Sequence, residues 1–125
     1  MWICDATGFF SIVKKDCGDD ELLVRARVYE DLKRLADKLT LPATAIIETP
    51  RADYRYRMTA KASAIAEYLA ASALAIDYDN FKASLPRKTP MDIKRARAYA
   101  DVWRTLRQLQ TRRAPNLGGP STFRV

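Results

Sequence analysis

The sequence contains no histidine, and this absence excludes several classes of enzyme. Ser-His-Asp and Cys-His nucleophilic sites cannot be built within the chain, because both use an imidazole as the general base. Zinc sites of the Cys₂His₂, His₃ and His₂Glu kinds are excluded for the same reason, and two cysteines cannot supply a Cys₄ site. Catalysis would have to rely on carboxylates, tyrosine, lysine or arginine.

Glycine, cysteine and long hydrophobic runs are also scarce. The four glycines form no GxGxxG, P-loop or GxSxG motif, so we expect no cofactor. Cys4 and Cys17 do not make a disulfide framework in a chain of 125 residues. No apolar run reaches about 18 residues, which argues against a membrane span. The first residues lack the basic and apolar blocks of a secretory signal, so we expect a cytoplasmic protein.

Positive charge is concentrated towards the C-terminus. Residues 1–85 carry 12 Lys and Arg against 13 Asp and Glu, a net charge of −1. Residues 86–125 carry ten against two, a net charge of +8. A surplus confined to one part of a chain can attract nucleic acid, an acidic protein or anionic lipid. The alternative is a solvated helix face followed by a loose tail.

Hydrophobic periodicity predicts an α+β fold. Alternation and β-branched runs predict strands at residues 2–4, 9–13, 22–28, 43–49 and 54–58, with Gly8 in the first turn. A 3.6-residue period predicts helices from residue 28 to 39, from 60 to 76 with Thr59 as cap, and from 90 to about 110. The last helix has Thr89 at its N-cap, a proline at its first position and an acid at its third. Residues 81–85 are expected to form a short turn or helix.

This order of elements resembles a split βαβ, ferredoxin-like arrangement. We expect a small antiparallel or mixed sheet of about five strands, with helices packed on one face and a long C-terminal helix. The strands at 22–28 and 54–58 should be central neighbours, with the strand at 9–13 beside the former. Residues 1–111 are predicted to form a single domain, and residues 112–125 a flexible basic tail.

Arginines alternate with core residues on the two strands expected at the centre of the sheet. They are Arg25, Arg27, Arg55 and Arg57. On one sheet face they would repel one another unless carboxylates or a bound anion intervene. RNA-binding sheets of similar topology present aromatic residues on an open face. Tyr54 and Tyr56 are expected on the opposite face here, or are exposed if the faces are reversed. Alternatively, the arginines pair with nearby acids.

The final helix carries a second group of basic residues, namely Lys94, Arg97, Arg104 and Arg107. Basic residues along a helix can follow the phosphates of a nucleic acid, and such binding weakens steeply with added salt. Apolar residues on the other side, Tyr99, Trp103 and Leu106, are expected to anchor this helix on the domain.

Two closely spaced carboxylates, Asp77 and Asp79, could hold Mg²⁺ or Ca²⁺ through their oxygens. The segment lacks the glycine and the distal glutamate of an EF-hand loop. The simpler interpretation is that Asp79 caps a helix while Asp77 lies at a helix end or pairs with an arginine.

The chain resembles a family of small uncharacterised bacterial proteins that also occur on phages or mobile elements. The resemblance extends over roughly residues 2–109 and is carried by short segments. They are Trp2, residues 8–13 and 23–27, Thr49-Pro50, Asp53-Tyr54, Tyr56-Arg57, the block Ile76-Asp77-Tyr78-Asp79-Asn80-Phe81-Lys82, and Val102-Trp103. It implies a compact bacterial domain and no established activity, cofactor or catalytic residue.

Together these observations predict a non-catalytic binding module that contacts nucleic acid or an acidic protein surface through the sheet arginines and the final helix. A protein-interaction factor, such as an inhibitor of a defence system, is the first alternative. A metal-dependent phosphodiesterase that uses Asp77 and Asp79 is the second. No membrane partner is expected.

Overall fold

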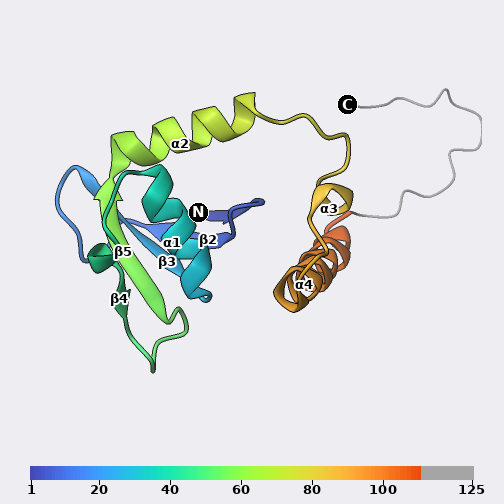
Figure 1. Cartoon of the computed structure of the whole chain (residues 1–125), viewed down its shortest axis with the longest axis horizontal. Helices are drawn as coiled ribbons and strands as arrows, with labels where there is room; N and C mark the ends of the chain where they lie inside the picture. The colour runs from blue at the N-terminus through green and yellow to red at the C-terminus, as the bar shows by residue number, and fades with distance from the viewer. Residues whose placement is uncertain (111–125) are drawn as a thin grey trace, which may run out of the picture. The chain divides into compact units, whose positions relative to one another are not determined.

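The structure, a computed structural model, describes residues 1–110 and divides into two compact units (Figure 1). Unit 1 spans Met1–Asp79, and unit 2 begins at Asn80. The tail expected over residues 112–125 lies outside the described residues. The single domain expected over residues 1–111 stays a prediction, because the presence of two compact units does not show whether each unit folds independently.

Unit 1 contains a five-stranded antiparallel sheet with the strand order β1-β2-β3-β5-β4. Its strands are β1 (Trp2–Cys4), β2 (Phe9–Val13), β3 (Glu21–Ala26), β4 (Ile47–Glu48) and β5 (Tyr56–Lys61). The α+β class, the antiparallel sheet and the central position of β3 beside β5 are confirmed.

The helices follow the predicted order with different boundaries. Unit 1 holds α1 (Tyr29–Lys38), a 3₁₀ turn η1 (Ala43–Ala45) and α2 (Ala62–Leu74), and unit 2 holds α3 (Phe81–Ser84) and α4 (Pro90–Arg107). The strand predicted over residues 43–49 is wrong except for two residues, because η1 occupies its first part. Thr59 does not cap α2, since β5 continues to Lys61.

The hydrophobic core lies on one face of the sheet, between its strands and helices α1 and α2. It contains Phe10, Ile12, Val24, Ala26, Leu32, Leu35, Ala36, Met58, Ala60, Ile65 and Tyr68. These residues alternate along the strands and recur at helical spacing in α1, the two patterns from which the sequence predicts the strands and this helix. Figure 1 shows α1 lying across the sheet. Because both helices belong to this core, the second face carries no helix of residues 1–79.

A buried carboxylate fixes the turn between β1 and β2. Asp31 of α1 is 1% exposed and accepts hydrogen bonds from the Phe9 amide at 3.2 Å and the Arg34 guanidinium at 2.8 Å. Arg34 also donates to the Thr7 carbonyl at 3.0 Å. A Cβ atom at Gly8 would stand 2.4–2.6 Å from the Asp31 side chain, so this position requires glycine.

Replacing Gly8 with alanine is expected to destabilise the protein by about 2–3 kcal/mol, because Asp31 must move and lose its bond to the turn. Chemical denaturation measures this change. The matched control is Gly18→Ala, where the new Cβ meets only the flexible end of Glu21, at 2.9 Å. The control should cost less than about 1 kcal/mol. Equal losses would contradict the role given to Asp31.

Tyr68 ties α2 to the same turn. Asp5 accepts hydrogen bonds from the amides of Thr7 at 2.8 Å and Gly8 at 3.1 Å, and its second oxygen accepts from the Tyr68 hydroxyl. Burial, together with the neighbouring Asp5 carboxylate, raises the pKa of Tyr68 to about 12. The hydroxyl therefore stays protonated in the folded protein at a pH where an unfolded tyrosine ionises.

This raised pKa predicts a loss of stability in alkali. Because the folded-state pKa of Tyr68 exceeds its ordinary value, its contribution is complete below pH 10 and is lost as the pH rises towards 12. We expect a decrease of roughly 1–2 kcal/mol, less than the full value for two pKa units, because part of the ring faces the solvent. Denaturation at pH 9 and 11.5 should show a smaller decrease for Tyr68→Phe. An identical decrease in both proteins would contradict the assignment.

Unit 2 is built around the start of α4. Thr89 and Asp92 form the predicted capping box, with the Asp92 amide donating to the Thr89 hydroxyl at 3.1 Å. The backbone amides of Lys88 and Thr89 donate to the Asp92 carboxylate and hold its pKa below the ordinary value. Tyr99 is buried and stacks on Phe81 with ring centroids 5.8 Å apart.

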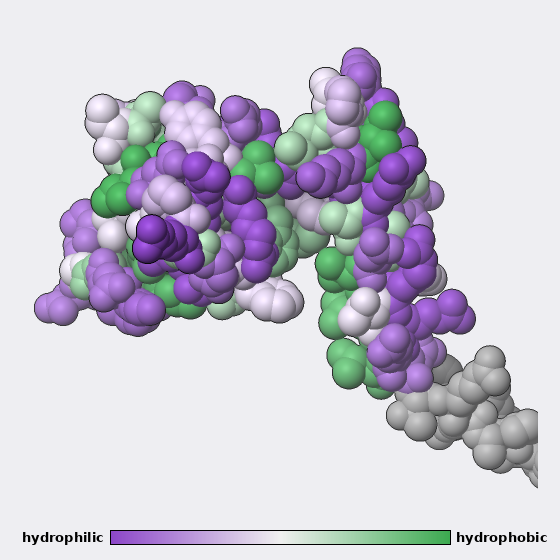
Figure 2. Space-filling model, turned by 90° about the horizontal axis from the view of Figure 1, so that it is seen from below, coloured by the Kyte–Doolittle hydropathy of each residue, from purple (hydrophilic) through white to green (hydrophobic). Residues whose placement is uncertain are grey.

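The second half of α4 carries exposed apolar residues. Trp103 is 49% exposed and Leu106 is 55% exposed, so unit 2 itself does not cover them, and the expectation that they anchor the helix on the domain stays a prediction. Val102 and Leu109 extend this apolar strip, being 42% and 79% exposed. Figure 2 shows hydrophobic side chains along one side of the helical unit that leads to the grey residues, and hydrophilic ones along the other.

Candidate anion-binding site

The sheet face opposite the core carries a row of side chains that crosses all five strands. Cross-strand partners link Trp2 to Ser11, Ser11 to Arg25, Arg25 to Arg57, and Arg57 to Ile47. Partners in an antiparallel register point to the same face. We call this surface, with Arg25, Arg27 and Arg57 at its centre and Tyr54 beneath them, the arginine face.

Arg25 and Arg57 lie directly opposite each other on β3 and β5. Arg25 donates one hydrogen bond to the Ser11 hydroxyl at 2.7 Å, and Arg57 donates one to the Tyr54 carbonyl at 3.3 Å. The Nε atoms of both arginines are buried without a hydrogen-bond partner. Two like charges in this position destabilise a sheet, and a buried donor without an acceptor adds to the cost.

No carboxylate of residues 1–110 forms an ion pair with Arg25, Arg27 or Arg57. The chain therefore leaves three guanidinium groups on one face without an internal counter-charge among the described residues. Guanidinium groups present planar donors that match carboxylate and phosphate oxygens. This arrangement is suited to binding an anion.

Tyr54 holds two of these arginines in place. Its ring is 4% exposed, and the guanidinium carbons of Arg27 and Arg25 lie 4.1 Å and 4.7 Å from the ring centroid. The prediction that Tyr54 lies on the opposite face is wrong, because β5 begins only at Tyr56 and strand alternation does not extend to residue 54. Tyr56 does lie on the core side, where its ring contacts Tyr29 at 5.6 Å.

Arg55 does not belong to this cluster. It precedes β5 and forms an exposed ion pair with Glu48 of β4 at 2.8 Å. The hydrogen bond and the charge of Glu48 raise the pKa of Arg55 above its ordinary value. The expectation that four arginines share one face therefore holds for three, and the alternative of a carboxylate partner holds for Arg55.

Two aromatic residues that the sequence analysis did not connect with the arginines lie on the same face. Trp2 is 71% exposed, and its ring meets Phe9 edge to face with centroids 5.8 Å apart. The Arg27 guanidinium carbon lies 5.8 Å from the Phe9 centroid. Only the β1–β2 register shows that Trp2 shares a face with Arg25.

The basic residues of α4 belong to unit 2 and do not form a single cluster. Arg97 and Arg104, together with Arg87, line an open cavity of about 460 Å³, and Arg104 pairs with Asp101. Arg107 instead lies over the Trp103 ring, at 5.6 Å. Lys94 is exposed near the start of the helix.

The acidic segment between the units shows no metal site. Asp77 and Asp79 are exposed, and the residue that caps α3 is Asn80, whose side chain accepts from the Ala83 amide at 3.0 Å. The prediction of Asp79 as cap is therefore wrong. Within residues 1–110, no three His, Cys, Asp or Glu residues are grouped so that they could hold a metal ion.

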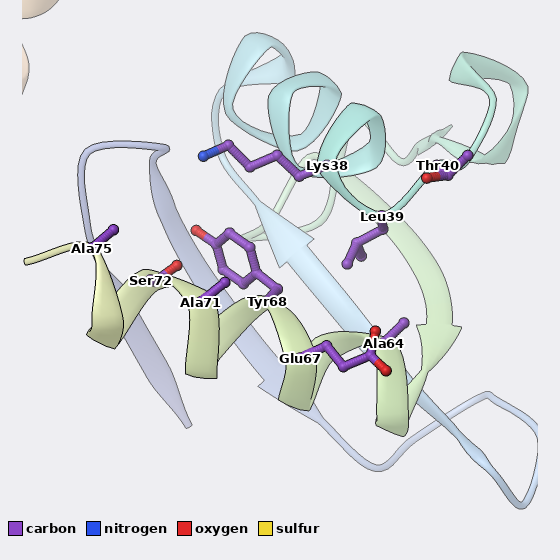
Figure 3. A pocket seen from close by; sticks show the side chains of 9 residues that line it. All are labelled: Lys38, Leu39, Thr40, Ala64, Glu67, Tyr68, Ala71, Ser72 and Ala75. Carbon is purple, nitrogen blue, oxygen red and sulfur yellow. The ribbon is translucent and has the colours of Figure 1, made fainter.

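A second cavity lies between the end of α1 and α2 (Figure 3). It measures about 540 Å³, and its lining includes Lys38, Glu67 and Tyr68 together with small side chains of α2. The Lys38 ammonium lies 5.8 Å from the Tyr68 ring centroid. This cavity holds one lysine and one carboxylate, whereas the arginine face gathers three cations.

Comparisons with protein-family models, curated proteins and solved structures found no match to this chain. The resemblance to small bacterial proteins stays a prediction. Among the described residues, no helix combines the length and the hydrophobicity needed to cross a bilayer.

An unpaired arginine cluster predicts stabilisation by small anions. Phosphate at about one to three times its Kd should raise the Tm by about 2–6 °C relative to chloride at equal ionic strength. The double substitution Arg25→Gln with Arg57→Gln should remove this increment, whereas Arg55→Gln should retain it. Scanning calorimetry measures the difference. An equal increment in all three proteins would show that phosphate acts elsewhere.

Proposed function

We propose that this protein is a non-catalytic module that binds nucleic acid through the arginine face. The observation that carries the proposal is the cross-strand pair of Arg25 and Arg57, which has no carboxylate partner in residues 1–110. Arg27 adds a third charge above the same tyrosine. Phosphate oxygens would accept hydrogen bonds from the guanidinium groups and neutralise the repulsion between them.

Nucleic acid fits this face better than an acidic protein does. The surface combines guanidinium groups with the exposed Trp2 ring and the half-buried Phe9 ring on one face of the sheet. A nucleic acid offers both phosphates and flat bases to such a surface, whereas an acidic protein patch offers only carboxylates. Unit 2 carries further basic residues that could bind phosphates independently of this face, namely Lys94, Arg97, Arg104 and Arg107.

The strand order supports a further proposal about the fold. Strands β3, β4 and β5 with helices α1 and α2 follow the order of a ferredoxin-like unit, and β2 lies beside β3 in the position that a C-terminal strand would fill, with β1 added at the edge. We propose this arrangement as a variant of that architecture. Its open sheet face is the face that RNA-binding relatives of the architecture use.

Fluorescence anisotropy with labelled oligonucleotides at 50 and 200 mM salt tests the proposed function. The double variant of Arg25 and Arg57 to glutamine should bind about 10- to 100-fold more weakly, since each lost contact with a charged group is worth roughly 1 kcal/mol or more. The slope of log K against log salt should decrease by about 0.7–0.9 for each arginine lost.

Arg55→Gln is the matched control, because Arg55 stands two residues from Arg57 and already pairs with Glu48. This variant carries the same loss of charge as a single substitution on the arginine face. Its affinity should change less than about twofold. If wild-type protein binds no DNA or RNA at 50 mM salt, or if Arg55→Gln weakens binding as much as Arg57→Gln, the proposal is wrong.

A protein-interaction factor is a second candidate, favoured by the exposed apolar strip of α4. Val102, Trp103 and Leu106 are each more than 40% exposed. A partner bound there should be lost on Leu106→Asp and retained on the double substitution of Arg25 and Arg57. Affinity capture after nuclease treatment distinguishes the two surfaces, and retention by Leu106→Asp would contradict this second candidate.

A further inference from the structure

The aromatic residues of the arginine face differ in the surface that they leave open. Tyr54 is 4% exposed beneath two guanidinium groups, and Phe9 has Arg27 over its ring. Trp2 is 71% exposed, and its ring packs edge to face against Phe9. Trp2 is therefore the aromatic group on this face whose ring can accept another ring.

The Trp2 indole is displayed from an ordered strand. The Ile12 amide donates to the Met1 carbonyl at 2.8 Å, and the register pairs Trp2 with Ser11. A large aromatic side chain that stays exposed forgoes the favourable free energy that burial of its apolar surface would contribute. An aromatic residue held open beside uncompensated guanidinium groups is the combination that stacks bases while phosphates are neutralised.

We infer that the ligand of the arginine face is a single-stranded nucleic acid, with a base stacked on Trp2 and phosphates at Arg25 and Arg57. This inference rests on the proposed function and specifies its substrate class. In a duplex the bases stack on one another and offer no ring to the indole.

The dimensions of the sheet also disfavour a duplex. Five strands at a spacing of about 4.8 Å make a face roughly 19 Å across, broader than the roughly 12 Å major groove of B-DNA. Trp2 of β1 and Arg57 of β5 are separated by β2 and β3. A flexible single strand can cross the strands and contact both residues.

Trp2 itself reports on the test, because the chain has two tryptophans and the other, Trp103, belongs to unit 2. In a Trp103→Phe background the emission comes from Trp2 alone. Titration compares a single-stranded oligonucleotide, the same sequence as a duplex, and an abasic strand with the same phosphates. We expect quenching of Trp2 by the single strand and affinity at least tenfold higher than for the duplex or the abasic strand.

Substitutions at Trp2 separate stacking from simple hydrophobic packing. Trp2→Leu should weaken binding of the single strand about 5- to 100-fold and leave binding of the abasic strand unchanged. Trp2→Phe should restore most of the affinity, since its ring can still stack. The thermal midpoint of each variant, followed by circular dichroism, confirms that the fold is intact.

Each outcome decides between the two proposals. Equal affinity for single strand, duplex and abasic strand, or wild-type affinity in Trp2→Leu, would overturn the single-strand inference while leaving nucleic-acid binding intact. Binding to none of the three at 50 mM salt would overturn the proposed function itself. If inorganic polyphosphate binds with the same affinity as the single-stranded oligonucleotide, charge alone selects the ligand, and the inference is overturned.

Discussion

The opposition of Arg25 and Arg57 across β3 and β5 is the constraint around which the open face is organised. Two guanidinium groups in directly paired positions raise the free energy of the empty sheet. The structure reduces this cost through the Ser11 hydroxyl, the Tyr54 carbonyl and the Tyr54 ring, which contact the arginines without carrying charge. The contacts orient both groups and leave their Nε–H donors unsatisfied. A bound anion would supply the counter-charge that no carboxylate of residues 1–110 provides.

The buried side of the sheet determines which residues reach the open side. Val24, Ala26 and Met58 pack under α1 and α2, so the residues between them must point away from the core. A shift of register by one residue would bury Arg25 and expose the core residues, at a cost far above the stability of a small domain. The Asp31 and Asp5 contacts that fix the β1–β2 turn hold Trp2 in the same register. Packing on one face thus pre-organises the proposed site on the other.

Much of this architecture could be predicted from the sequence, because alternation in strands and period in helices follow directly from burial. Arg25 and Arg57 were placed on one face by alternation alone. Tyr54 and Arg55 were not predicted correctly, since they precede β5 and irregular backbone obeys no period. Trp2 was missed because its face depends on a long-range register. For the strip around Trp103, apolar periodicity predicts a contact but does not indicate what covers it.

Arginine side-chain NMR offers the most direct measurement of the central claim. In ¹H–¹⁵N spectra, the guanidinium resonances of Arg25 and Arg57 should shift when a single-stranded oligonucleotide is added to saturation. The resonance of Arg55, already paired with Glu48, should stay in place. If the Arg25 and Arg57 resonances are unchanged at saturation while those of other arginines move, the anion binds elsewhere and the account is contradicted.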